Sequence, residues 1–149
     1  MLSRVLLIFC LTFCLFSCSK KEAIYTPSEE NNPYNLYQKG LDAFQKNDFF
    51  YASKKFSEAE INFDIPELAA KSSIMASFSL YGINFYRDAI DNLERYLKTY
   101  PADKNNIYAH YLMAIIFFEQ ISDEKKDLKP LIRADKKIKF FLRKYPNSE

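Results

Sequence analysis

A chain of 149 residues leaves room for one domain after a signal peptide, and a formal net charge of +2 indicates no particular class of partner. One histidine and three cysteines give little material for a metal site. The chain has only two glycines but eleven tyrosines and fourteen phenylalanines, which favours helices over a turn-rich β-sandwich.

The first seventeen residues are typical of a signal peptide. Arg4 supplies a positive charge, and an apolar run follows from Val5 to Phe16. About twelve apolar residues are too few for a membrane-spanning helix, which needs about twenty, but they suit the hydrophobic region of a signal peptide. We therefore expect residues 1–17 to be removed. An uncleaved anchor and an ordinary secreted protein are the alternatives.

The segment Leu15-Phe16-Ser17-Cys18 ends this run and resembles the lipobox of bacterial lipoproteins. The resemblance implies cleavage before Cys18 and a covalent lipid on its thiol, although Phe16 stands where that motif usually has a small residue. Acyl chains anchor a protein because each buried methylene group contributes about 0.8 kcal/mol. Residues 18–33 are mostly polar, so we expect them to form a flexible, lipidated tether.

A repeated pattern of apolar residues predicts helices that pack in the same way. From Ala89, large apolar residues follow four, seven, eight and eleven positions later and a proline twelve positions later, and the same offsets recur from Ala134. An earlier, partial copy begins at Ala52. Residues at these offsets share one face of a helix, and the proline ends it. Each copy therefore predicts a helix whose packing stripe begins with a small residue.

Each of these helices follows a partner helix, so the sequence predicts three helix–turn–helix pairs. We expect an all-α fold, a TPR-like right-handed solenoid over residues 34–149, with pairs at 34–63, 66–100 and 105–146. A polar insertion at 122–129 lengthens the last pair. The expected helices are 34–46, 49–62, 66–82, 85–98, 106–120 and one that starts at Pro130.

Several segments together resemble the BamD family, the TPR lipoproteins of the bacterial outer-membrane β-barrel assembly machinery. The resemblance lies in the lipobox, in YQKGLDAFQKNDFFYASKKF from Tyr37, in RDAIDNLERYLKTYP from Arg87, and in NNIYAHYLMAI followed after an insertion by ADKKIKFFLRKYPNSE. It covers roughly residues 15–149. That family has about five repeats and three are present here, so we expect a fragment or a truncated reading frame that ends at Glu149.

The resemblance implies an outer membrane protein assembly factor, a non-catalytic lipoprotein held at the periplasmic face of the outer membrane by the lipid on Cys18. The implied partners are a BamA-like barrel subunit, other lipoproteins of the machinery and unfolded outer-membrane proteins. Another TPR lipoprotein scaffold of the cell envelope, in pilus or division assembly, is the alternative. The long insertion in the last pair and the sequence KYPNS favour the first interpretation.

If the groove of the solenoid binds peptide, the inward positions of the first helix in each pair are the candidate binding residues. Aromatic rings offer a large contact area with few rotatable bonds, which suits the aromatic and alternately apolar end of an outer-membrane protein. Lys71 would meet the terminal carboxylate. The alternative is that these side chains form the core between helices. The candidates are Tyr34, Tyr37, Leu41, Phe44, Lys71, Ile74, Phe78 and Tyr81.

The sequence contains no set of residues that suits catalysis or metal binding. His110 is the only histidine, and Cys10 and Cys14 leave with the signal peptide, so we expect neither a nucleophile–histidine pair nor a zinc site. We expect no cofactor besides the covalent lipid. The basic residues between Lys125 and Lys144 are interpreted as a solvated helix face, with anionic lipid or an acidic protein as alternatives; nucleic acid is not an expected partner.

Overall fold

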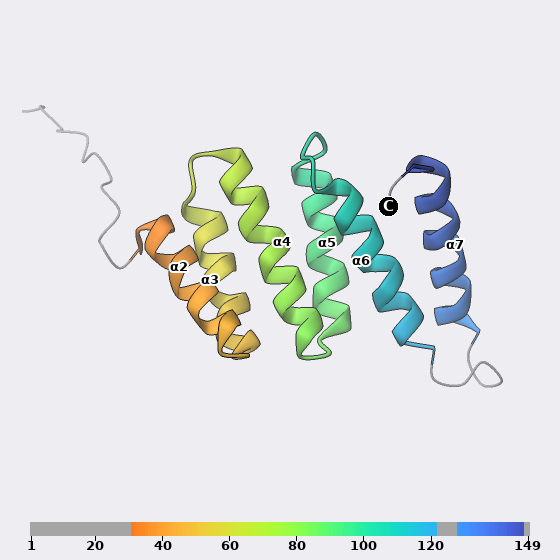
Figure 1. Cartoon of the computed structure of the whole chain (residues 1–149), viewed down its shortest axis with the longest axis horizontal. Coiled ribbons are helices and arrows are strands. Elements are labelled where there is room, and N and C mark those ends of the chain that lie inside the picture. The colour runs from red at the N-terminus through yellow and green to blue at the C-terminus, as the bar shows by residue number, and fades with distance from the viewer. Residues whose placement is uncertain (1–30, 122–127, 148–149) are drawn as a thin grey trace, which may run out of the picture.

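The computed structural model describes residues 31–121 and 128–147, and the regular elements of this part of the chain are α-helices. They lie side by side in chain order, with α2 at one end of the array and α7 at the other (Figure 1). Wherever the sequence predicted the first or last residue of a helix, the observed residue lies within one position of the predicted residue. The bounds are α2 Pro33–Gln45, α3 Phe49–Asn62, α4 Pro66–Gly82, α5 Tyr86–Thr99, α6 Asn106–Glu119 and α7 Lys129–Lys144.

The helices form three pairs, which confirms the expected all-α, TPR-like fold. The signal peptide expected at 1–17, Cys18 and most of the tether lie outside the described residues, and so does most of the insertion at 122–129.

The turns inside the first two pairs have the same backbone geometry. Asn47 and Asn84 have φ angles of 59° and 60°, in the left-handed region that asparagine tolerates better than most residues. In both turns, the N–H of the next residue donates to the carbonyl five positions earlier at 2.9 Å. This bond closes the end of a helix, and Asp48 then starts α3 by accepting a hydrogen bond from the N–H of Tyr51 at 3.2 Å.

Small residues are buried where neighbouring helices approach each other. Ala52 and Ala89 are 0% exposed and Ala134 is 2% exposed, as the repeated stripe predicted. Gly40 has the same role on α2, because a Cβ atom at this position would lie 2.7 Å from the ring of Phe56 on α3. The contact between α2 and α3 therefore requires a residue without a side chain.

Helix α4 packs against α3, α5 and α6, and its buried residues are mostly alanine and serine. Ser72, Ser73, Ser77 and Ser79 are all 0% exposed. Three of these hydroxyls donate to the carbonyl four residues earlier in the same helix, at 2.8 to 3.0 Å. Because the helix itself satisfies these hydroxyls, serine serves here as a small packing residue.

A partly buried ion pair joins the first helix pair to the second. The carboxylate of Glu60, a residue that is 7% exposed, accepts two hydrogen bonds from the guanidinium of Arg95 at 2.7 and 2.6 Å. The hydroxyl of Tyr100 donates to the same carboxylate at 3.1 Å. Hydrogen bonding to Glu60 raises the pKa of Arg95, and burial raises the pKa of Tyr100 to about 12. Both donors therefore keep their protons at neutral pH.

Helix α7 differs from α5 in the burial of its packing stripe. Leu93 and Tyr96 of α5 are 0% exposed, whereas Ile138, the equivalent of Leu93, is 39% exposed. The reason is that α5 lies between α4 and α6, while α7 packs mainly against α6 among the described residues. Leu142 of α7 is likewise 59% exposed.

We expect Gly40→Ala to destabilise the protein by about 1 to 3 kcal/mol, because the added methyl group would overlap the fully buried ring of Phe56. Gly82→Ala is the matched control. Its methyl group would lie 3.1 Å from the ring of Phe49, which is only partly buried and can shift. Urea denaturation of both variants measures the difference, and equal midpoints for the two would contradict the close-approach argument.

Candidate functional site

Aromatic side chains from α2, α4 and α6 form a continuous row. Ring centroids lie 5.7 Å apart for Phe44 and Phe78, 6.3 Å for Phe78 and Tyr108, and 6.5 Å for Tyr108 and Tyr111. Tyr81 extends the row at 6.0 Å from Phe78. These separations are typical of favourable aromatic pairs. We call these five residues the aromatic row; four are partly buried and Tyr111 is 48% exposed, so the row keeps ring surface available to a ligand.

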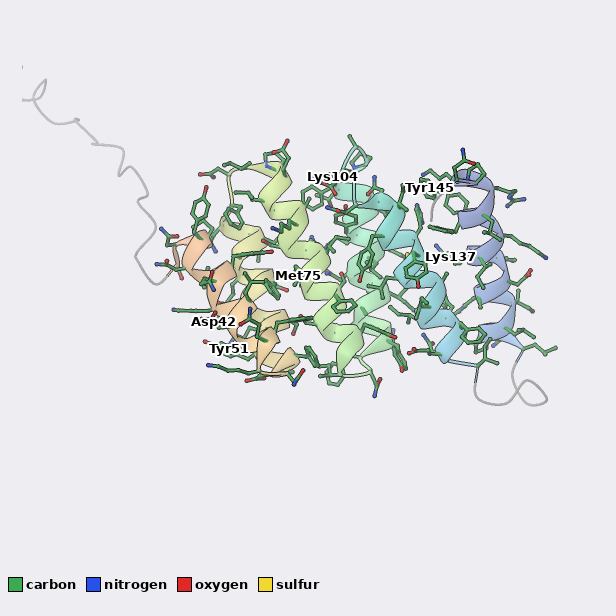
Figure 2. The ribbon with its side chains drawn as sticks, viewed as in Figure 1. Asp42, Tyr51, Met75, Lys104, Lys137 and Tyr145 are labelled. Atoms are coloured by element: carbon green, nitrogen blue, oxygen red, sulfur yellow. The ribbon has the colours of Figure 1, made fainter. Side chains whose placement is uncertain are left out.

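A cation lies near the α2 end of this surface. The ammonium group of Lys71 is 5.4 Å from the centroid of the Tyr37 ring, within the range of a cation–π contact. Lys71 is exposed and forms no ion pair in the described part of the chain. A cavity of about 560 Å³ beside it lies between the start of α4 and the α5–α6 turn, where Lys104 is seen in Figure 2. Two lysines, Lys71 and Lys104, and two acidic residues, Glu67 and Asp103, line this cavity, so Lys71 offers a carboxylate its contact on the side that faces Tyr37.

The remaining predicted candidates divide between surface and core. Tyr34 is 57% exposed, with its ring 5.1 Å from that of Phe63. Leu41 packs against the core of the first pair, and Ile74 is 7% exposed within the core that α4 shares with α5, α6 and α7. Leu41 and Ile74 therefore contribute to packing. The structure brings together Tyr37, Phe44, Lys71, Phe78 and Tyr81.

Tyr108 and Tyr111, which continue the aromatic row on α6, were not among the residues predicted from the sequence. The segment that contains them is apolar on nearly all sides, so its periodicity does not mark one face. Its register relative to the other first helices is also obscured by the insertion that follows it. A signal was present, because the two tyrosines are spaced as neighbours on one helix face.

Hydrogen bonds fix the end of the row near the α4–α5 turn. The hydroxyl of Tyr81 donates to one carboxylate oxygen of Glu119 at 2.7 Å, and the hydroxyl of Tyr86 donates to the other at 3.1 Å. The bond to Glu119, followed by burial, raises the pKa of Tyr81 to about 12. Glu119 therefore ties α4 and α5 to α6, which holds the aromatic residues of these helices in register.

His110 contacts α7 rather than the aromatic row. Its ring lies 4.8 Å from that of Phe140 and 6.2 Å from that of Tyr145, and its Nδ1 atom is buried without a hydrogen-bond partner. Burial, together with the positive charges of Lys144 and Lys137, lowers the pKa of His110 to about 4. The imidazole is therefore neutral at pH 7 and serves as a packing group.

The aromatic row offers ring surface and the hydroxyl groups of three tyrosines for contact with a ligand. In the described ranges, no group of three or more His, Cys, Asp or Glu side chains is placed to hold a metal ion. The helices in these same ranges include none with the length and hydropathy needed to cross a membrane. The fold and the aromatic row together define a TPR-like helical-repeat protein that presents aromatic rings along α2, α4 and α6.

The chain belongs to the YfiO family of outer membrane lipoproteins, which it matches over residues 29–149. A protein of Caulobacter vibrioides named outer membrane protein assembly factor BamD is 30% identical over 136 residues, which cover 91% of this chain and 44% of that protein. The protein of the same name from Rickettsia prowazekii is 25% identical over 114 residues, 76% of this chain and 45% of that protein. A third, from Xylella fastidiosa, is 22% identical over 147 residues, 92% of this chain and 50% of that protein.

These findings confirm the resemblance to the BamD family. The chain spans about half the length of the curated relatives it matches, between 44% and 53%.

We expect the stability of the protein to fall as the pH drops from about 6.5 to 4. In this window His110 takes up a proton in the unfolded chain, where its pKa is near 6.5, but not in the folded chain, where its pKa is about 4. Above pH 6.5 the group is neutral in both states and contributes no pH dependence.

His110→Phe should therefore show a shallower loss of unfolding free energy between pH 7 and pH 5 than the wild type in urea titrations. Phenylalanine keeps a ring beside Phe140. The two proteins share all other titrating groups, so parallel curves in this range would show that His110 does not titrate as described.

Proposed function

We propose that this protein is an outer membrane protein assembly factor, a non-catalytic lipoprotein that binds unfolded outer-membrane proteins. Membership of the YfiO family and similarity to relatives named as BamD support this proposal over most of the chain. The single observation that carries it is the aromatic row with Lys71 beside Tyr37.

The row suits a polypeptide that ends in an aromatic residue and has apolar side chains at alternating positions. Exposed ring surface on α2, α4 and α6 offers contacts along the helix array, from one helix pair to the next. The ammonium group of Lys71 supplies a positive charge for the terminal carboxylate. Aromatic contacts lose little side-chain entropy on binding, so a modest surface can hold an unfolded segment.

We further propose that a covalent lipid on Cys18 anchors the protein in the periplasmic leaflet of the outer membrane. There it would meet a BamA-like barrel subunit and other lipoproteins of the assembly machinery. Two or three acyl chains on one cysteine satisfy the requirement of more than one membrane signal for stable anchoring. The alternative, a scaffold for pilus or division assembly, would use the same anchor but different partners.

A binding titration tests the proposed peptide surface. The probe is a fluorescent peptide that ends in phenylalanine with a free carboxylate, and the protein is the full mature chain in detergent. Tyr111→Ala should weaken binding about two- to tenfold, because an aromatic pair contributes about 0.5 to 1.5 kcal/mol. Lys71→Gln should reduce the preference for the free carboxylate over the C-terminal amide.

Phe50→Ala is the matched control, because Phe50 is 63% exposed on α3 and has no ring contact with the aromatic row. An equal loss of affinity for Phe50→Ala and Tyr111→Ala would count against the surface. Absence of any binding by the wild type would count against the proposed function.

The lipid anchor has its own test. Cys18→Ser should abolish incorporation of radiolabelled palmitate and move the protein from the outer-membrane fraction to the soluble periplasmic fraction. Ser19→Ala is the control and should leave both readouts unchanged. Palmitate incorporation that persists in Cys18→Ser would show that the lipid is attached elsewhere.

A further inference from the structure

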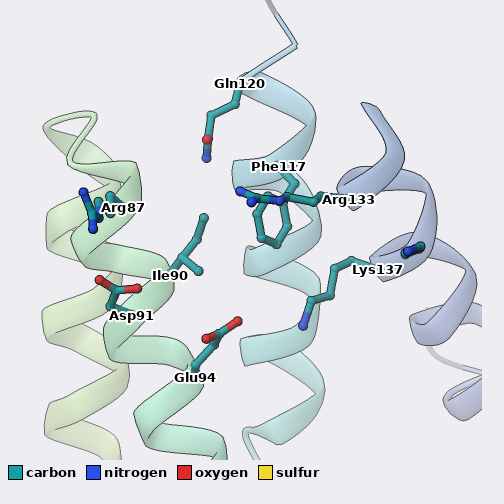
Figure 3. Close-up of a pocket in the computed structure, with 9 residues that line it drawn as sticks. Arg87, Ile90, Asp91, Glu94, Phe117, Gln120, Arg133 and Lys137 are labelled. Atoms are coloured by element: carbon teal, nitrogen blue, oxygen red, sulfur yellow. The ribbon is translucent and has the colours of Figure 1, made fainter. Parts of the chain in front are cut away.

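A second hollow lies between α5 and α7, above the side chains of α6, and has a volume of about 660 Å³ (Figure 3). We call it the α5–α7 groove. Its floor is formed by Phe117 of α6, which is 6% exposed, and by Gln120 at the C-terminal cap of α6, and Ile90 of α5 contributes a partly exposed apolar side chain. Helices α5 and α7 each pack against α6, which leaves this space between them. The groove is thus bounded by two helices and floored by a third.

This groove is separate from the aromatic row. Phe117 and Tyr108 are both on α6 and are nine residues apart (117 minus 108), which corresponds to two and a half helical turns. They therefore lie on opposite sides of α6. A ligand can occupy the groove without touching the aromatic row, and the inference below does not depend on the proposed peptide-binding function.

The two walls of the groove differ in charge. Asp91 and Glu94 of α5 are exposed and lie on one wall, with Arg87 one turn before Asp91 on the same helix, while Arg133 and Lys137 of α7 lie on the other (Figure 3). Lys136 of α7 also lines the groove. These acids and bases form no ion pairs with one another across the groove. Both sets of charged side chains are therefore available to a ligand that binds between α5 and α7.

We propose that the α5–α7 groove binds an amphipathic helix of a partner protein. That helix would place an apolar residue on Ile90, which is partly exposed, basic side chains against Asp91 and Glu94, and acidic side chains against α7. A helix suits the space because packed helices lie about 8 to 10 Å apart, so one laid over α6 would contact α5 and α7 at once.

The charge pattern restricts which helix can bind. A helix with basic residues on both flanks would be repelled by α7, and one with acidic residues on both flanks would be repelled by Asp91 and Glu94, a repulsion that Arg87 offsets only at the start of α5. A helix with opposite charges on its two flanks suits both walls best, and its direction along the groove is then fixed. Such like-charge repulsion is a common source of specificity between proteins.

Photo-crosslinking in the native cells tests this inference on the full chain. The photoreactive residue p-benzoylphenylalanine replaces Gln120 in the groove, and Lys54, exposed on α3, as a control position. Mass spectrometry then identifies the peptide crosslinked to each position. The expected adduct at position 120 maps to an amphipathic helix of a different protein, with basic residues on one flank and acidic residues on the other.

Charge reversal provides the matched comparison. The double substitution Asp91→Lys and Glu94→Lys should reduce the adduct about tenfold, because two attractive contacts become repulsive. Asp42→Lys with Asp88→Lys makes the same change in net charge at exposed residues outside the groove and should leave the yield unchanged. Exchanging the basic flank of the identified helix for glutamate should restore the adduct in the first variant.

Three results would overturn the inference. The adduct at position 120 could be no stronger than at the Lys54 control position, it could map to a second copy of this chain or to a segment without the flank pattern, or its yield could be insensitive to the charge reversal. Each outcome is independent of the peptide titration at the aromatic row, so the two proposals can fail separately.

Discussion

The close approach of neighbouring helix backbones is the constraint on which the rest of this structure depends. Gly40 lies against the ring of Phe56, Ala52 and Ala89 are fully buried, and α4 is lined with alanine and serine where other helices cross it. Because these positions are small, a neighbouring helix can pack a large side chain such as Phe56 against them. The aromatic row on α2, α4 and α6 depends on this close spacing, since its ring contacts join three helices.

The sequence predicted the features that depend on local spacing. The stripes from Ala52, Ala89 and Ala134, with the prolines that follow, located three helix pairs, because periodicity and helix ends are recorded in consecutive residues. Five of the eight groove candidates also lie together at one surface, including Phe44 and Phe78, whose rings are in contact. All five are on α2 and α4, the first helices of their pairs, whereas the repeated stripes lie on the second helices.

The spacing of apolar residues in the sequence could not predict features that depend on the distance between helices. Glu60 and Arg95 are 35 residues apart, and neither has a sequence context that marks it as buried. The aromatic residues of α6 were missed because an all-apolar segment does not reveal which face is outward. The α5–α7 groove was also not predicted, because in the sequence the basic residues of α7 are typical of a solvated helix face, and only the fold places α5 opposite them.

The ion pair between Glu60 and Arg95 has a consequence for how the array comes apart. In a linear array each repeat touches only its neighbours, so adjacent repeats can unfold separately. Separating the first pair from the second here would break the two hydrogen bonds between Arg95 and Glu60 and the bond from Tyr100, in addition to the packing of α3 against α4. These contacts favour opening of the first four helices together, and Tyr37 and Lys71, which lie on different repeats, keep a constant spacing for as long as they hold.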